Sequence, residues 1–153
     1  MKYALVVAAV VLGLWSVPGQ ADQKKLDKIA SCSGVVIGNA ALDYALGDER
    51  AFDEATDLAM SAFLGYALGH EHGQEDLQFA DRIMLVNIDK IVQADSNQVW
   101  DSTVYEEIVD CYRLVATTVY ANINDIKANQ AKIRNATHNL STRLKRVIDH
   151  TWN

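Results

Sequence analysis

Two pairs of side chains in this sequence could take part in covalent or metal chemistry, one of cysteines and one of closely spaced histidines. Cys32 and Cys111 are the two cysteines, and they form neither a CxxC redox motif nor a CxxCH haem-attachment motif. In an oxidising compartment, an even number of well-separated cysteines favours a structural disulfide over a nucleophilic thiol. We therefore predict one disulfide, between Cys32 and Cys111.

The second pair, His70 and His72, flanks Glu71 and forms the one metal-like cluster in the sequence. Imidazoles with nearby carboxylates are ligands that divalent transition metals accept. No third ligand follows at helical spacing, and Gly69 and Gly73 indicate that the segment is a loop. We interpret it as a polar turn, predict no metal and no cofactor, and keep His70 and His72 as weak metal candidates.

No catalytic motif accompanies these residues. The chain has no GxSxG nucleophile turn, no HExxH zinc motif and no glycine-rich phosphate loop. Its carboxylates are numerous, but their spacing follows no pattern that general acid–base catalysis needs. The sequence therefore predicts that the protein is not an enzyme.

The first 21 residues have the three parts of a secretory signal peptide. Lys2 supplies a positive charge, residues 3–15 form an apolar run, and the small residues Gly19 and Ala21 precede the expected cleavage. Because the run is shorter than the about 20 apolar residues that cross a bilayer, cleavage is favoured over the alternative of an uncleaved N-terminal anchor. No later stretch is long and apolar enough to span a membrane, so the mature chain is not expected to do so. We predict export by a bacterial-type signal peptide and a periplasmic or secreted location.

Helical periodicity covers nearly all of the remaining sequence. The single proline, Pro18, lies in the predicted signal peptide, and apolar residues recur at three- and four-residue steps. Gly47 is predicted to end the first helix, and Asp48 to cap the second. The predicted helices cover about residues 24–46, 49–68, 75–93 and 103–153.

Short connections between these segments predict an all-α, four-helix bundle-like single domain. The fourth helix is predicted to open with a capping box formed by Thr103 and Glu106. Strict antiparallel packing would place Cys32 and Cys111 at opposite ends of the bundle. The predicted disulfide therefore indicates either a steep crossing of the first and last helices or a parallel arrangement of the two.

The last predicted helix carries a coiled-coil-like heptad repeat. Unbroken from residue 103 to 153, it would be about 75 Å long against about 30 Å for each other helix, so we expect its end to project. A break and fold-back near residues 122–129, where asparagines cluster, is the alternative.

The heptad repeat of this helix has the a positions Val109, Ala116, Ile123, Gln130, Thr137 and Leu144. The d positions, which we define as the interaction seam, are Tyr112, Val119, Ile126, Ile133, Leu140 and Val147.

Charge divides the chain at the same place. The net charge is −6, and a predicted acidic helical bundle, residues 22–125, precedes a basic C-terminal extension, residues 126–153, in which Asp149 is the one acidic residue. Such asymmetry is typical of an interaction tail. We define the basic tail as Lys127, Lys132, Arg134, Arg143, Lys145 and Arg146.

Together these features favour an exported binding protein, such as an adaptor, an inhibitor or a chaperone-like protein, acting through the interaction seam and the basic tail. The predicted partner is another protein or a second copy of the chain, through the last helix. An anionic surface is a further alternative, whereas nucleic acid is disfavoured because the tail has few aromatic residues. The alternative function is a periplasmic metal or cofactor carrier that uses His70 and His72.

Overall fold

The computed structural model describes residues 18–70, 72–96 and 101–152, which are helical apart from short turns. Most of the predicted signal peptide, residues 1–17, lies outside the described residues, so its cleavage stays a prediction. The described helices are α2 (Pro18–Ala45), α3 (Glu49–Gly69), α4 (Gln74–Ser96), α5 (Ser102–Ala121), α6 (Ile123–Ala128) and α7 (Gln130–Trp152).

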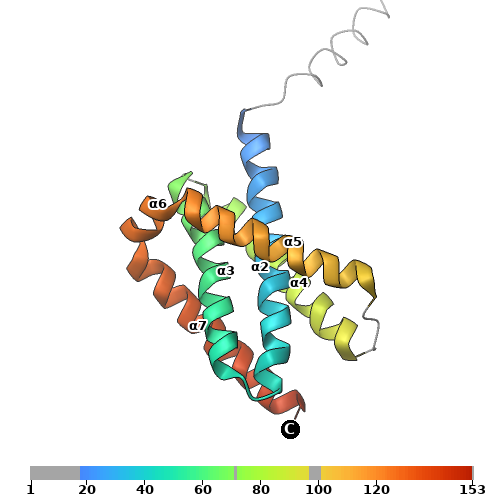
Figure 1. Ribbon diagram of the computed structural model, residues 1–153. Coiled ribbons are helices and arrows are strands. Elements are labelled where there is room, and N and C mark those ends of the chain that lie inside the picture. The colour runs from blue at the N-terminus through green and yellow to red at the C-terminus, as the bar shows by residue number, and fades with distance from the viewer. Residues whose placement is uncertain (1–17, 71, 97–100, 153) are drawn as a thin grey trace, which may run out of the picture.

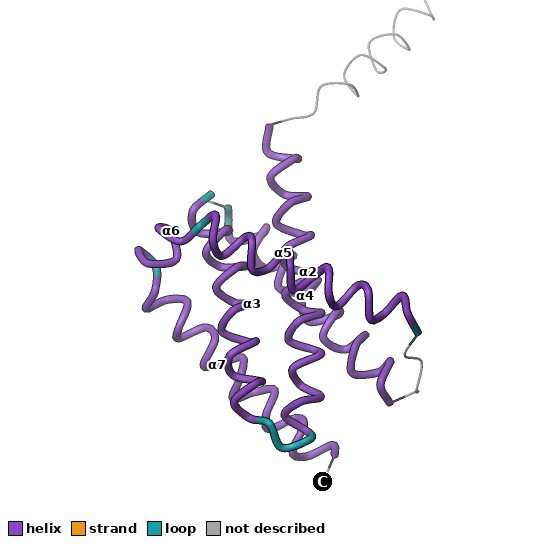
Figure 2. The backbone as a smooth tube through the Cα atoms, viewed as in Figure 1, coloured by secondary structure: helices purple, strands orange, loops and turns teal. Residues whose placement is uncertain are grey.

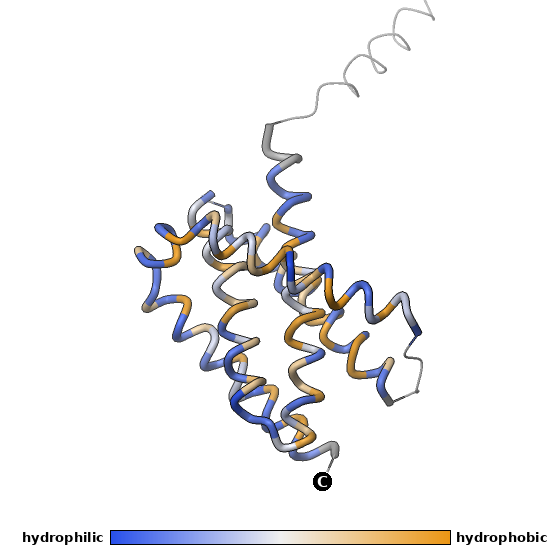
Figure 3. The backbone as a smooth tube through the Cα atoms, viewed as in Figure 1, coloured by the Kyte–Doolittle hydropathy of each residue, from blue (hydrophilic) through white to orange (hydrophobic). Residues whose placement is uncertain are grey.

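The prediction of an all-α bundle with one disulfide is confirmed (Figure 1). The described part of the chain consists of helices and connecting loops, and α2 packs against α3, α4, α5 and α7 (Figure 2). Hydrophobic and hydrophilic residues both occur in successive turns of most helices, as expected when one side of a helix is buried and the other faces solvent (Figure 3). Within the described residues, no helix is both long enough and apolar enough to span a membrane.

The packing of α2 against α4 depends on two glycines of α2. A Cβ atom at Gly34 would collide with the carbonyl oxygen of Met84, and one at Gly38 would lie 2.9 Å from the carbonyl oxygen of Ile88. The two backbones can therefore approach more closely than side chains would permit, which offsets the cost of glycine inside a helix. Met84 is completely buried at this contact.

Local signals set two of the helix boundaries as predicted. Gly47 has a φ of +95°, the left-handed conformation that glycine adopts most readily at the end of a helix. The side chain of Asp48 accepts a hydrogen bond from the backbone N–H of Ala51, at 2.9 Å. Gly47 and Asp48 thus turn the chain from α2 into α3.

The predicted capping box of Thr103 and Glu106 is wrong. The helix begins one residue earlier, and Asp101 is its N-cap. The Asp101 carboxylate accepts hydrogen bonds from the backbone N–H groups of Thr103 and Val104, at 2.9 and 3.1 Å. Asp101 satisfies these donors from outside the helix, so Thr103 lies within the first turn rather than at the cap.

Cys32 and Cys111 form the predicted disulfide, with their Cα atoms 4.7 Å apart. Figure 1 shows α5 crossing α2 at a steep angle, which is the first of the two arrangements that the sequence left open. Both cysteines are buried. The disulfide therefore fixes the crossing point of the two helices inside the core.

The prediction that the last helix projects from the bundle is wrong. The helix ends at Ala121, resumes as α6, ends again at Ala128, and returns as α7 along α3 and α2. An asparagine lies at each break: the amide of Asn122 donates to the carbonyl of Thr118, and that of Asn129 donates to the carbonyl of Asp125. Each carbonyl also accepts the backbone N–H of the same asparagine, so the side-chain bond is added to the last helical bond and does not replace it. Asparagine is a weak helix former, which lowers the cost of a break at these positions.

The Gly34→Ala substitution tests the close contact of α2 with α4. We expect it to lower the free energy of unfolding by about 3 kcal/mol, because the new methyl group would meet the α4 backbone, which has little room to move. Urea denaturation of oxidised protein measures this change. The matched control is Gly73→Ala, where the nearest atom to an added Cβ is 3.8 Å away. Equal effects at both positions would contradict the proposed role of Gly34.

Candidate functional site

The fold-back of the chain divides the interaction seam. Ile133 and Leu140 are buried within the chain's own core, whereas Val147 is exposed. The seam residues before the second break, Tyr112, Val119 and Ile126, are half-buried. The d positions therefore do not form one continuous exposed stripe, because α3 and α2 cover part of them.

One member of the basic tail, Lys145, lies against the acidic start of α3. Its Nζ atom is 2.7 Å from Oε1 of Glu49 and 2.8 Å from Oδ1 of Asp53. The same nitrogen lies 5.6 Å from the ring centre of Tyr44 and 5.5 Å from that of Phe52, within the range of a cation–π contact. The Lys145 side chain is only 19% exposed. The opposite charges of the two chain regions therefore meet within one molecule at this point.

The remaining basic-tail residues face solvent. They are Lys127, Lys132, Arg134, Arg143 and Arg146.

A hydrogen bond also joins the last turns of α7 to α2, because the Tyr44 hydroxyl donates to Asp149, at 3.1 Å. The end of α7 is thus fixed to α2 and α3, while most of its positive charge remains exposed.

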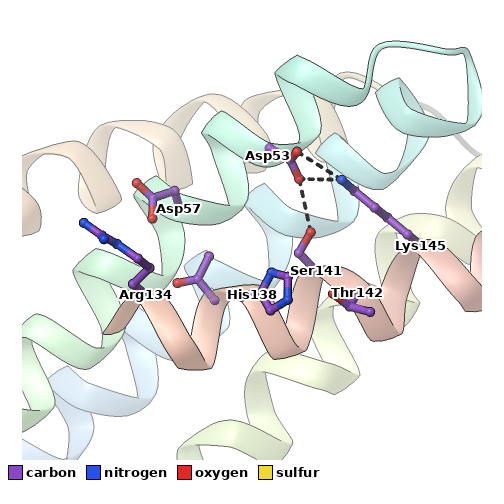
Figure 4. A pocket seen from close by; sticks show the side chains of 8 residues that line it. Asp53, Asp57, Arg134, His138, Ser141, Thr142 and Lys145 are labelled. Atoms are coloured by element: carbon purple, nitrogen blue, oxygen red, sulfur yellow. Dashed lines mark hydrogen bonds and ion pairs between the residues drawn. The ribbon is translucent and has the colours of Figure 1, made fainter. Parts of the chain in front are cut away.

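A polar cleft of about 410 Å³ lies between α3 and α7 (Figure 4). Asp53 joins the two helices, because it accepts hydrogen bonds from Ser141, at 3.1 Å, and from Lys145. Figure 4 shows Asp57 of α3 near Arg134 of α7 at one end of the cleft. The lining residues are Asp53, Asp57, Arg134, Thr137, His138, Ser141, Thr142 and Lys145.

The charges in the cleft do not favour nucleophilic catalysis by Ser141. A neighbouring lysine can act as a base only when its amine is neutral. Burial lowers the pKa of Lys145, but its hydrogen bonds to Asp53 and Glu49 outweigh this effect, and the net pKa is raised above the ordinary 10.5. Lys145 therefore remains a cation at neutral pH. Its arrangement with Asp53 and Ser141 supports helix packing rather than proton transfer.

The two histidines pack around Tyr66. The His70 ring stacks on it with centres 4.0 Å apart, and its Nδ1 atom is 2.9 Å from the Tyr66 carbonyl oxygen. His72 is largely buried, and Nδ1 of its ring lies 3.9 Å from Asp76. Apart from Glu71, which lies outside the described residues, no group of three His, Cys, Asp or Glu side chains there could hold a metal. The alternative of a metal carrier that uses His70 and His72 therefore stays untested and gains no set of three ligands among the described residues.

An apolar hollow of about 400 Å³ lies where α7 returns to α2 and α4. Its charged lining residue is Asp89, and the rest of its lining is aliphatic. Such a hollow offers contact area but few polar groups to orient a ligand. The aliphatic lining residues are Ala41, Leu85, Ile88, Val92, Leu144, Val147 and Ile148.

The structure shows an exposed stripe on α5 that was not predicted from the sequence. Tyr105 and Tyr120 are 66% and 85% exposed, and the a positions Val109 and Ala116 between them are also exposed. All four recur at steps of four and seven residues, which places them on one side of a helix. We call these four residues the α5 stripe. The sequence did contain a signal for this stripe, because residues 103–121 carry apolar residues on two sides of one helix. Contact with the core requires apolar residues on one side only.

The contact of Lys145 with α3 can be tested by Lys145→Met. We expect the free energy of unfolding to fall by about 1 kcal/mol at low salt, because Glu49 and Asp53 lose their shared cation. Urea denaturation with and without 0.5 M salt would check this, since salt should reduce the difference. The control is Lys132→Met, at an exposed position of the same helix. A loss that is equally large at Lys132 would contradict the assignment.

The raised pKa of Lys145 also predicts a pH dependence. A cation whose pKa is raised by folding stabilises the protein fully below the unfolded pKa and loses this effect as the pH rises through the folded pKa. The stability difference between wild type and Lys145→Met should therefore be constant from pH 7 to about 9 and should shrink above about 10.5. Denaturation curves across this range measure it. A difference that shrinks below pH 8 would contradict the prediction.

Comparison of the chain with family models, with curated proteins and with solved structures finds no match. Its function is therefore inferred from its own surfaces and their chemistry.

Proposed function

We propose that this chain is an exported, non-enzymatic binding protein that engages a protein partner through the outer face of α5. The observation that carries the proposal is the α5 stripe, in which two exposed tyrosines and the apolar residues between them share one side of the helix. Single exposed apolar residues are ordinary, but alignment on one face is typical of an interaction surface. Tyrosine in particular is enriched at protein interfaces and in their energetic centres.

The attachment of α5 to the bundle supports this role. The Cys32–Cys111 disulfide links it to α2, and Lys90 of α4 forms an ion pair with Glu107, at 2.7 Å. A face that is held rigidly before binding loses less conformational entropy when the partner docks. The α5 stripe is therefore preorganised on its helix.

The exposed part of the basic tail supplies a second, electrostatic contribution. Long-range attraction between complementary charges raises association rates more than it raises affinity. An acidic partner or an anionic surface near the bundle would therefore be attracted by the tail before it contacts the α5 stripe.

Export rests on two features of the sequence. The first is the predicted signal peptide, and the second is the pairing of Cys32 with Cys111, since disulfides persist in oxidising compartments such as the periplasm and the extracellular space. A periplasmic or secreted location is part of the proposal.

Site-specific photo-crosslinking in the native cells tests the proposed function. A photoreactive residue at position 120 should yield a discrete crosslinked product, because this side chain projects from the stripe. The matched control is position 86 on α4, where Val86 is 67% exposed and lies outside the stripe. The same products from both positions, or none from position 120, would contradict the proposal. The mass of the product also reports whether the partner is a second copy or another protein.

A further inference from the structure

We propose that the apolar hollow and the basic end of α7 together bind a single-chain anionic amphiphile, such as a fatty acid or an alkyl phosphate. The hydrocarbon chain occupies the hollow, and the anionic head lies on Arg143 and Arg146. This site is separate from the α5 stripe, so the inference goes beyond the proposed protein-binding function and stands or falls independently of it.

The hollow arises from the way three helices pack. Both α4 and α7 pack against α2 more closely than against each other, which leaves a space of about 400 Å³ between them. This volume lies within the range of about 300 to 1,000 Å³ that small-molecule sites occupy. Seven of the eight lining residues are aliphatic, so covering them with a hydrocarbon chain releases water. One of the seven, Val147, is 61% exposed, so the α7 wall of the hollow reaches the surface.

Two arginines lie beside this wall. Arg143 is four residues before Val147, a spacing that brings side chains together on a helix, with about 5 to 6 Å between their Cβ atoms. Arg146 directly precedes Val147, and both arginines are exposed. Lys90 and Lys145 each lie 2.7 Å from a carboxylate oxygen, whereas no ion pair holds Arg143 or Arg146 in the described part of the chain. Two guanidinium groups next to the hollow are therefore free to bind an anion.

The charges around the hollow favour an anionic head over a cationic one. The charged lining residue, Asp89 of α4, already accepts a hydrogen bond from the amide of Gln93, at 2.7 Å. Guanidinium groups bind carboxylates and phosphates through paired, charge-assisted hydrogen bonds. Arg143 and Arg146 thus supply a group that orients the ligand, which the aliphatic lining lacks. Because Asp89 repels an anion, the head lies toward α7 and the chain extends toward α4.

A series of ligands with increasing chain length tests the hollow. Each methylene group that enters it should strengthen binding about fourfold, until the hollow is full. Isothermal titration calorimetry with hexanoate, octanoate and decanoate, below the concentrations at which they form micelles, measures these affinities. We expect one molecule to bind per chain. Equal affinities along the series would overturn the placement of the hydrocarbon chain.

Ligands with other head groups test the role of charge. Octanol, whose head is uncharged, should bind about fivefold more weakly than octanoate, because it forms no ion pair. Octylamine should bind more weakly still, because the arginines repel its ammonium group. An octylamine that binds more tightly than octanoate would show that Asp89 selects the ligand, and this result overturns the proposal.

Substitution of an arginine tests the position of the head. Arg143→Gln should weaken decanoate binding about fivefold, because the exposed guanidinium contacts the anion. It should leave octanol binding unchanged. The matched control is Lys28→Gln, at an exposed position of α2 that lies about 20 Å along the helix from Ala41 of the hollow. Equal losses of decanoate binding in the two variants would indicate general charge attraction and overturn the site.

An anionic lipid within a bilayer offers the same chemistry as a free amphiphile, and vesicles distinguish the two sources. Sedimentation with vesicles of phosphatidylglycerol and phosphatidylcholine measures attachment to a bilayer. Attachment to these vesicles without any binding of decanoate overturns the site and leaves surface attraction by the basic tail. If neither decanoate nor vesicles bind, while position 120 still crosslinks to a protein in cells, the amphiphile site is overturned and the proposed function stands.

Discussion

The disulfide between Cys32 and Cys111 fixes the crossing of α5 over α2, and much of the surface depends on that crossing. The bond joins residues 79 positions apart, and closing a loop of that length stabilises a fold by about 4 to 5 kcal/mol in the chain-entropy model. Because α5 lies across the bundle, only one side of it is covered. Ile108 and Val115 face the core with Cys111, while Val109 and Ala116 face outward. The exposed stripe is thus a consequence of the crossing geometry.

The return of α7 is the second constraint, and it combines local and long-range effects. The helix is interrupted at Asn122 and at Asn129, two weak helix formers whose amides donate to carbonyls four residues earlier. The return is then stabilised where Lys145 reaches Glu49 and Asp53, and where buried apolar residues of α7 join the core. Acidic and basic residues are separated along the sequence, but the return of α7 brings some of them into contact within one molecule.

The sequence predicted the features that local chemistry decides. The helical segments, the turn at Gly47 and Asp48, and the pairing of the two cysteines follow from propensity, capping and redox chemistry. The direction of the last segment could not be predicted in this way. A heptad pattern indicates that one side of a helix is buried. It does not indicate what buries that side, because Ile133 and Leu140 have the same spacing whether they pack against a partner or against their own domain. Asn122 and Asn129 indicated where the helix could break. Whether it breaks there depends on the packing of the returning segment against α2 and α3, which the sequence pattern does not show.

The candidate sites differ in how far their groups are already satisfied. In the polar cleft, Asp53 accepts from Ser141 and Lys145, so a ligand would have to replace existing charge contacts before it gained new ones. The α5 stripe imposes no such exchange, because Tyr105 and Tyr120 extend apolar rings into solvent, and covering them releases water without breaking an ion pair. The ion pair between Arg113 and Asp110 lies beside the stripe and can gain neighbours while it keeps its own partner. This difference supports the proposed association through α5 rather than through the cleft, although the cleft contains the more chemically diverse side chains.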